Sequence, residues 1–140
     1  MKSHRFLEHT ADVLLEASGS SFEEAFEAAA EGMFETIADA GKLGEGRQVE
    51  IKEKAPDLES LVVFTLSGLL GEMEAEEIFL KRLKVERFEK AGGNFVLEAI
   101  AYGSEQDPKL GKIVVKAVTH HLLKVEEKKG SWKIRILLDI

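Results

Sequence analysis

The spacing of apolar residues predicts one strand and then one helix in the first third of the chain. Residues 5–17 have the character of a strand. Overlapping capping boxes follow, pairing Ser20 with Glu23 and Ser21 with Glu24. Beyond them, the apolar residues keep helical spacing until Gly41 supplies a stop: Phe22, Ala25, Phe26, Ala29, Met33 and Ile37.

A second helix is predicted after a short strand at 48–54. It opens at Pro56-Asp57 and is apolar on most of its sides up to Met73. A surface helix keeps one polar face, so we expect this helix to be buried between layers.

From Phe79 onward the period changes to two, which is typical of strands. Strands are predicted at 83–88, 95–102, 112–118, 122–127 and from Trp132 to the end, with a bend or bulge at 119–121. The fold class predicted is α+β. The order is β-α-β-α followed by five mostly antiparallel strands, a layered sheet packed on two helices in a single domain, 1–140.

Composition narrows the function classes. The chain has 140 residues and no cysteine, which excludes disulfides, thiolate zinc sites and a nucleophilic cysteine. There is no apolar run of about 20 residues that could span a membrane, so we expect a soluble, cytoplasmic protein. The net charge of −7 argues against general affinity for nucleic acid.

Charge is distributed unevenly along the sequence. Residues 1–80 hold 18 acidic and 6 basic residues, whereas residues 81–140 hold 8 acidic and 13 basic residues. Two solvated faces of opposite sign would explain this. A basic half that meets an acidic or phosphate-rich partner would explain it too.

Two aspartates at the chain ends are the candidate metal ligands. Asp12 lies in an apolar opening segment, and Asp139 follows an apolar run and precedes Ile140. Carboxylate and carbonyl oxygens suit hard cations such as Ca²⁺ and Mg²⁺, so the two aspartates with Ile140 form a reasonable donor set if the ends meet. The alternative is that Asp12 makes local hydrogen bonds and Asp139 is a solvated terminus.

Histidines and one lysine are the other candidates. His9 beside Asp12 could act as a base or orient a ligand, although a hydrogen-bonded structural role is more common. His120 and His121 point to opposite faces of a regular strand and chelate poorly. Lys116, expected mid-strand, is either an ordinary solvent-facing lysine or a cation aimed at a phosphate or a partner's carboxylate. Nothing here forms a convincing enzyme active site.

Taken together, four motifs in order resemble the archease family over nearly the full length. They are Glu8-His9-Thr10-Ala11-Asp12-Val13, Ser21-Phe22-Glu23-Glu24-Ala25-Phe26, Val115-Lys116-Ala117-Val118-Thr119, and the closing segment from Trp132 to Asp139-Ile140. His120 departs from the pattern, because a tyrosine often follows the threonine in that family. We therefore give His120 no family role.

The resemblance implies a role in tRNA splicing as a protein cofactor, not an enzyme. Archeases accelerate the guanylylation of an RtcB-type RNA ligase and support its repeated turnover. The family pattern implies a divalent cation, Ca²⁺ with Mg²⁺ or Mn²⁺ as alternatives, at Asp12 and Asp139 with an oxygen from Ile140, and an activating role for Lys116. It also implies only indirect contact with tRNA. We further expect no membrane association and a monomer or weak oligomer.

Two other functions remain open from the sequence. A chaperone-like module could keep a tRNA-modifying enzyme soluble and shift its specificity without a metal. A metal-dependent phosphohydrolase could use His9, Asp12 and Asp139, but these are too few ligands for a two-metal site.

Overall fold

A computed structural model describes residues 2–7 and 12–140. The strands and helices are β1 (Ser3–Leu7), β2 (Val13–Gly19), α1 (Phe22–Ile37), β3 (Arg47–Ala55), α2 (Leu58–Glu76), β4 (Ile78–Ala91), β5 (Asn94–Glu105), β6 (Ala117–Lys128) and β7 (Ser131–Asp139). Short 3₁₀ turns occupy Ala40–Lys42 and Pro108–Leu110.

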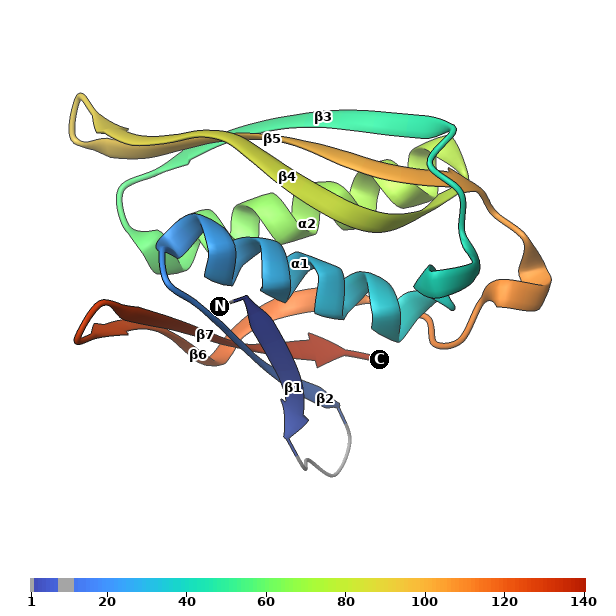
Figure 1. The fold of residues 1–140 in the computed structure, drawn as a ribbon, viewed down its shortest axis with the longest axis horizontal. Helices are drawn as coiled ribbons and strands as arrows, with labels where there is room; N and C mark the ends of the chain where they lie inside the picture. The colour runs from blue at the N-terminus through green and yellow to red at the C-terminus, as the bar shows by residue number, and fades with distance from the viewer. Residues whose placement is uncertain (1, 8–11) are drawn as a thin grey trace.

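The two helices lie between two antiparallel sheets (Figure 1). One sheet has the order β1-β2-β7-β6 and the other β3-β5-β4. The α+β class predicted from the sequence is therefore confirmed, with the strands divided between two sheets. The middle layer explains why α2 is apolar on most sides, since it packs against β3 of one sheet and β6 of the other.

Side-chain caps fix the start of each helix. The Ser21 hydroxyl accepts a hydrogen bond from the Glu24 amide at 3.1 Å, and the Glu24 carboxylate accepts one from the Ser20 amide at 2.9 Å. At α2, the Asp57 carboxylate accepts a hydrogen bond from the Ser60 amide at 2.7 Å. This hydrogen bond, the largest of several influences, holds the pKa of Asp57 below its ordinary value. Both caps satisfy amides that the first helical turn leaves without partners.

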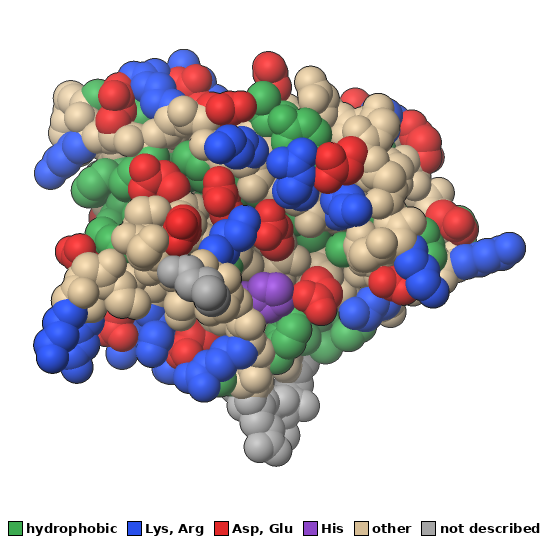
Figure 2. Space-filling view, in the orientation of Figure 1, with side chains coloured by type: hydrophobic (Ala, Val, Ile, Leu, Met, Phe, Trp, Pro, Cys, Tyr) green, Lys and Arg blue, Asp and Glu red, His purple; other side chains and the backbone are tan. Residues whose placement is uncertain are grey.

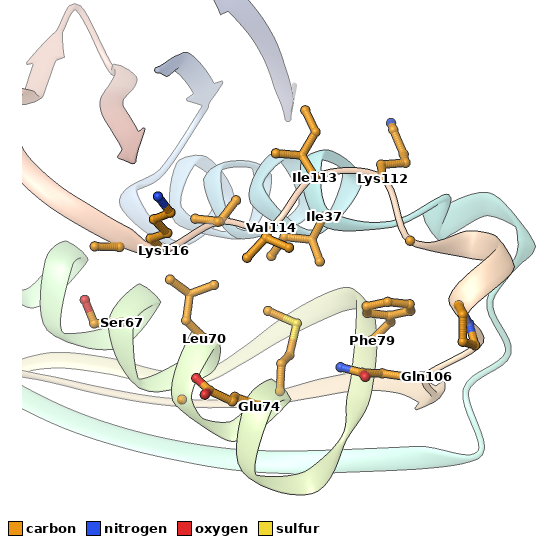
Figure 3. Close-up of a pocket in the computed structure, with 16 residues that line it drawn as sticks. Ile37, Ser67, Leu70, Glu74, Phe79, Gln106, Lys112, Ile113, Val114 and Lys116 are labelled. Atoms are coloured by element: carbon orange, nitrogen blue, oxygen red, sulfur yellow. The ribbon is translucent and has the colours of Figure 1, made fainter. Parts of the chain in front are cut away.

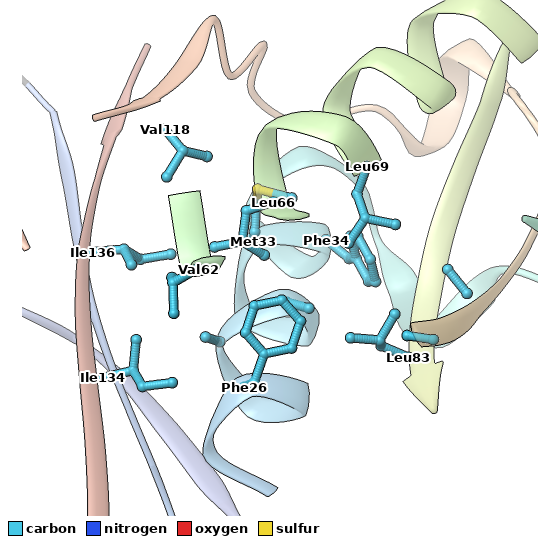
Figure 4. Close-up of a cluster of buried hydrophobic side chains, with 14 of the residues drawn as sticks. Phe26, Met33, Phe34, Val62, Leu66, Leu69, Leu83, Val118, Ile134 and Ile136 are labelled. Carbon is cyan, nitrogen blue, oxygen red and sulfur yellow. The ribbon is translucent and has the colours of Figure 1, made fainter. Parts of the chain in front are cut away.

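The hydrophobic core fills the space between the helices and both sheets (Figure 4). Each layer contributes side chains that are almost completely buried: Phe26, Met33 and Phe34 from α1, Val62, Leu66 and Leu69 from α2, Leu83 from β4, and Ile134 and Ile136 from β7. The alternation predicted for the last strand is confirmed, since Ile134, Ile136 and Leu138 face this core. Packing in this core therefore holds β7, which carries Asp139 at its end, in a fixed position.

The strand predicted at 5–17 is wrong. The structure has two antiparallel strands there, β1 and β2, paired from Ser3↔Ser18 to Leu7↔Leu14. The chain therefore changes direction between Leu7 and Val13. The sequence between them contains no glycine, proline or asparagine, which are common signals of a turn.

The strand predicted at 112–118 is also wrong. Residues 112–116 belong to no strand, and β6 begins only at Ala117. The predicted irregularity after Val118 is confirmed, because the pairing with β7 shifts between Thr119 and Lys124 and Leu122 has a φ of 61°. Residues 117–118 of the first predicted segment and all of the second, 122–127, therefore belong to one strand, β6, whose pairing with β7 is interrupted by an irregularity.

Acidic side chains of α1 cover the outer edge of β4. The Glu27 and Glu31 carboxylates accept hydrogen bonds from the amides of Val85 at 2.9 Å and Leu83 at 3.1 Å. An edge strand with free amides is a template for pairing with another chain. These glutamates occupy that template on the three-stranded sheet.

Candidate functional site

The register of β2 and β7 brings the two candidate aspartates to the same end of one sheet. The two strands are antiparallel, with Val13 opposite Leu138. Asp12 directly precedes Val13, and Asp139 directly follows Leu138, so one further step of the same register would set the aspartates opposite each other. Opposite residues of an antiparallel pair project from the same face of the sheet.

Both aspartates are half-buried, and neither forms an ion pair with a described residue. Neither carboxylate makes an ion pair or hydrogen bond with any residue in the ranges 2–7 and 12–140. Two negative charges at one sheet end repel each other. Such a pair is stabilised by a cation placed between them.

Lys116 is attached to this end of the sheet through its backbone. Its amide donates a hydrogen bond of 2.7 Å to the Asp139 carbonyl, and the next residue, Ala117, pairs with Asp139. The Lys116 side chain is exposed and makes no ion pair or hydrogen bond within the described part of the chain. The backbone thus fixes where the lysine sits, while the ammonium group stays available to a partner.

These residues offer a small donor set that suits a hard cation. In the described ranges, no three His, Asp or Glu side chains gather closely enough to hold a metal ion. A site here would therefore combine the carboxylates of Asp12 and Asp139 with an oxygen of Ile140, which is 37% exposed, and with water. All of these donors are oxygens, as Ca²⁺ and Mg²⁺ prefer.

A buried glutamate joins the strands that carry the aspartates. Glu16 of β2 is only 3% exposed, and its carboxylate lies 2.6 Å from the Arg5 guanidinium of β1 and 3.0 Å from that of Arg135 of β7. Lys133 approaches the same carboxylate at 3.9 Å. This network ties together β1, β2 and β7 on the sheet face turned away from the helices.

The structure describes two of the three candidate histidines, His120 and His121. His9 lies outside the described residues, so its proposed role as an orienting group stays a prediction. His120 and His121 are exposed at the bulge of β6. The charge of His120 contributes slightly to the lowered pKa of Asp57, at the start of α2.

Acidic and basic side chains are interspersed over the face shown in Figure 2. Ion pairs join the acidic first part of the sequence to the basic second part, as between Glu45 and Arg82 at 2.8 Å and between Glu16 and Arg135. On this face the charge imbalance along the sequence is not a separation into two regions.

One feature that the sequence did not indicate is an apolar groove of about 910 Å³ beside Lys116. Residues 112–116 form one wall, and Ser67, Leu70, Gly71 and Glu74 of α2 form the other, with Phe79 and Gln106 at one end (Figure 3). Val114 is 78% exposed and Ile113 is 40% exposed. The available signal was the run Lys112-Ile113-Val114-Val115-Lys116, which we assigned to a paired strand.

Comparison with known proteins gives one consistent family. A model described as the Archease protein family matches residues 4–140. The protein archease of Methanosarcina mazei is 37% identical over 141 residues, which cover 99% of this chain and 97% of the relative. That of Aeropyrum pernix is 33% identical over 135 residues, covering 95% and 94%.

Solved structures agree with this fold. The solution structure of Methanobacterium thermoautotrophicum protein 1598 superposes with a TM-score of 0.86 at 31% identity, covering 98% of each chain. The crystal structure of a Thermotoga maritima archease, described as a possible chaperone, gives a TM-score of 0.61 at 21% identity over 96% of this chain and 94% of that one. The second likeness shows the fold alone. Separately, no helix among the described residues is long and apolar enough to cross a membrane.

Proposed function

The chain belongs to the archease family, and from this premise we propose that it is a metal-binding protein cofactor that activates an RtcB-type RNA ligase in tRNA splicing. In this proposal it works in the cytoplasm, is not itself an enzyme, promotes guanylylation of the ligase and its multiple turnover, and meets tRNA only indirectly. The observation that supports the proposal is the β2–β7 register, which brings Asp12 and Asp139 to the same end of one sheet, where the Lys116 amide donates a hydrogen bond to the Asp139 carbonyl.

Each residue has a distinct part in this proposal. Asp12, Asp139 and an oxygen of Ile140 would hold a divalent cation, Ca²⁺ in the first instance and Mg²⁺ or Mn²⁺ as alternatives. When bound, such a cation supplies positive charge that oxygens of a partner or its nucleotide can share. Lys116 adds a second positive charge beside the pair, on a flexible side chain that can reach a phosphate or a carboxylate.

Electrostatic preorganisation explains how so small a protein could speed nucleotidyl transfer. Nucleotidyl transfer develops negative charge on phosphate oxygens, and a cation held in place at that point costs no reorganisation during the reaction. The clamped core behind β7 and the Glu16 network would keep the aspartates and Lys116 in place. The protein would thereby favour the conformer of the ligase that is competent for guanylylation.

Single-turnover guanylylation and multiple-turnover ligation by the matching ligase, with and without this protein, test the proposal. We expect faster guanylylation and repeated turnover only when the protein is present. Equal rates in its absence would refute activation. Incubation of the protein alone with phosphoesters tests the phosphohydrolase alternative, and we expect no hydrolysis.

A chaperone-like role is the second candidate, and the exposed apolar wall at Ile113 and Val114 favours it. The Thermotoga maritima protein carries the description possible chaperone, and this chain would share that role. Light scattering of a tRNA-modifying enzyme during heating separates the two candidates. A chaperone suppresses aggregation with Asp12→Ala as well as with the unaltered protein, whereas the metal-binding cofactor loses its effect on the ligase.

A further inference from the structure

The backbone amides of residues 113–115 donate no hydrogen bonds within the described part of the chain. The Lys112 amide donates to the Ile37 carbonyl at 2.8 Å, and the Lys116 amide donates to the Asp139 carbonyl at 2.7 Å. Between these two anchors, the amides of Ile113, Val114 and Val115 donate no hydrogen bond to any described residue. Free amides in a segment pinned at both ends offer a ready partner for another chain.

The opposite wall of the groove leaves room for that chain. Ser67 and Gly71 lie one helical turn apart on α2, and both are exposed. A Cβ built on Gly71 meets nothing within 4 Å, so the space next to the helix is open. The groove therefore combines free amides, exposed apolar side chains and an accessible wall.

The charged residues that line the groove indicate which kind of polypeptide segment would bind there. Among the described residues that line the groove, Lys112 and Lys116 are basic and Glu74 on the opposite wall is acidic. The Lys112 ammonium donates one hydrogen bond to the Glu35 carbonyl at 2.8 Å, which leaves two of its N–H groups for a partner's carboxylate. If two copies of this segment paired antiparallel about Val114, each Lys112 would lie opposite the other copy's Lys116, and like charges placed opposite are destabilising. A different chain with carboxylates four residues apart would instead place one opposite each lysine.

We propose that this groove binds an extended segment of the ligase that has an apolar centre and two carboxylates spaced four residues apart. The identity of the partner rests on the proposed function, whereas the chemistry of the bound segment rests on the groove alone. The bound segment aligns along residues 112–116, its backbone accepts hydrogen bonds from those free amides that point to its side, and its acids meet Lys112 and Lys116. Docking there brings the ligase against Lys116 and the end of β7.

Peptide titration of the isotope-labelled full chain, followed by NMR, tests the groove without the ligase. Two capped peptides share one apolar core and differ only in two residues spaced by four, glutamate in one and lysine in the other. We expect shifts at the amides of 113–115 and at Ser67 and Gly71, with the glutamate peptide binding about tenfold more tightly. Equal affinities, shifts elsewhere, or no shift with the glutamate peptide at millimolar concentration overturns the proposal.

Two substitutions separate blocked docking from lost folding. Gly71→Leu fills the groove and replaces a helical glycine with a better helix former, so binding should be lost without a lower thermal midpoint. Val114→Asp places a negative charge at a side chain that is 78% exposed in the groove wall and should also abolish binding. Gly44→Leu is the matched control, since its Cβ also meets nothing within 4 Å and it does not line the groove. Binding unchanged in both groove variants overturns the proposal.

Charge reversal tests the selection by lysine. Lys112→Glu should weaken the glutamate peptide and strengthen the lysine peptide, whereas Lys128→Glu, an exposed lysine remote from the groove lining, should change neither. An unchanged preference in Lys112→Glu contradicts the proposed alignment.

The ligase assay then distinguishes this inference from the proposed function. If the unaltered protein activates the ligase and Gly71→Leu activates it equally, the groove is not the docking site, although activation stands. If the unaltered protein does not activate the ligase, the proposed function fails and the peptide titration alone decides whether the groove selects acidic segments. Activation lost in Gly71→Leu and retained in Gly44→Leu supports both.

Discussion

Replacing Glu16 with glutamine would remove the charge at the centre of the network that joins β1, β2 and β7. Glutamine keeps nearly the same volume, so packing around the side chain changes little. It places an amide beside the Arg5 and Arg135 guanidinium groups, which lie 2.6 Å and 3.0 Å from the native carboxylate. The Arg135 Nε, buried without a hydrogen-bond partner among the described residues, gains no compensation.

The solvent exposure of Glu16 and its arginine partners determines how much folding stability the substitution should remove. Exposed ion pairs contribute about 0.2–1 kcal/mol, whereas breaking a fully buried pair costs about 3–5 kcal/mol. The Glu16 side chain is 3% exposed, but those of Arg5 and Arg135 are 67% and 35% exposed, so water screens part of the interaction. We expect Glu16→Gln to lower the free energy of unfolding by about 1–2 kcal/mol, or the thermal midpoint by about 3–8 °C.

The pH dependence gives the sharper test. Burial, the largest single influence, acts to raise the pKa of Glu16, but hydrogen bonds from Arg135 and Arg5 and the charges of Lys133 and Arg5 together hold it below its ordinary value of 4.5. The unfolded chain therefore binds this proton at higher pH than the folded protein. The stabilisation is complete above the ordinary pKa and is lost as the pH falls through the lower folded pKa.

Urea denaturation of both proteins at a series of pH values measures this dependence. The stability gap between the unaltered protein and Glu16→Gln should be constant near neutral pH and should close in the acidic range below about pH 4.5. Glu50→Gln, at an exposed strand glutamate without an ion pair to any described residue, should open no gap. A gap that persists at low pH, or no gap at pH 7, would refute the reasoning.

Four further outcomes are expected. Asp12→Ala and Asp139→Ala should each abolish Ca²⁺ binding in calorimetric titrations while unfolding stays cooperative, and unchanged titrations would exclude the cation site. Lys116→Ala should sharply reduce ligase guanylylation yet change stability by no more than about 0.5 kcal/mol, with Lys116→Arg restoring part of the rate; normal activation by the alanine variant would remove the residue from the mechanism. Activation should weaken as salt rises and the screening length falls to about 8 Å, whereas a flat salt profile would indicate an apolar interface. Gly103→Ala should cost about 1–3 kcal/mol or more in thermal denaturation, because its Cβ would collide with the Phe79 carbonyl, and an unchanged midpoint would contradict the close approach.

The sequence by itself determined the two helices, because the signals that define a helix are local. The helical spacing that begins at Phe22 and the cap at Ser21 predicted α1, which runs from Phe22 to Ile37. Pro56-Asp57 predicted the start of α2, which begins at Leu58. Hydrogen bonds within a helix join residues four apart, so nearby sequence suffices to specify them.

Only the tertiary structure decided which extended segments are strands. Residues 112–116 have the composition of a strand, but β7 ends at Asp139, which pairs with Ala117, and no β7 residue remains to pair with them. In the same way, the apolar character of residues 5–17 continues through a chain reversal that only the pairing of β1 with β2 reveals. A β-strand is defined by hydrogen bonds to a neighbouring strand, and the segment's own sequence does not specify which strand that is.

For the candidate site too, the sequence indicated the residues and the tertiary structure decided their relative positions. Asp12, Asp139 and Lys116 were identified as candidates from the sequence, because charged residues within or beside apolar runs are uncommon. The metal-binding and activating roles that the family resemblance implies for them stay predictions. That Asp12 and Asp139 lie at the same end of one sheet was decided by the register that pairs Val13 with Leu138. A shift of one residue would turn the apolar face of β7 away from the helices, so the core that buries Ile134 and Ile136 also fixes the position of Asp139.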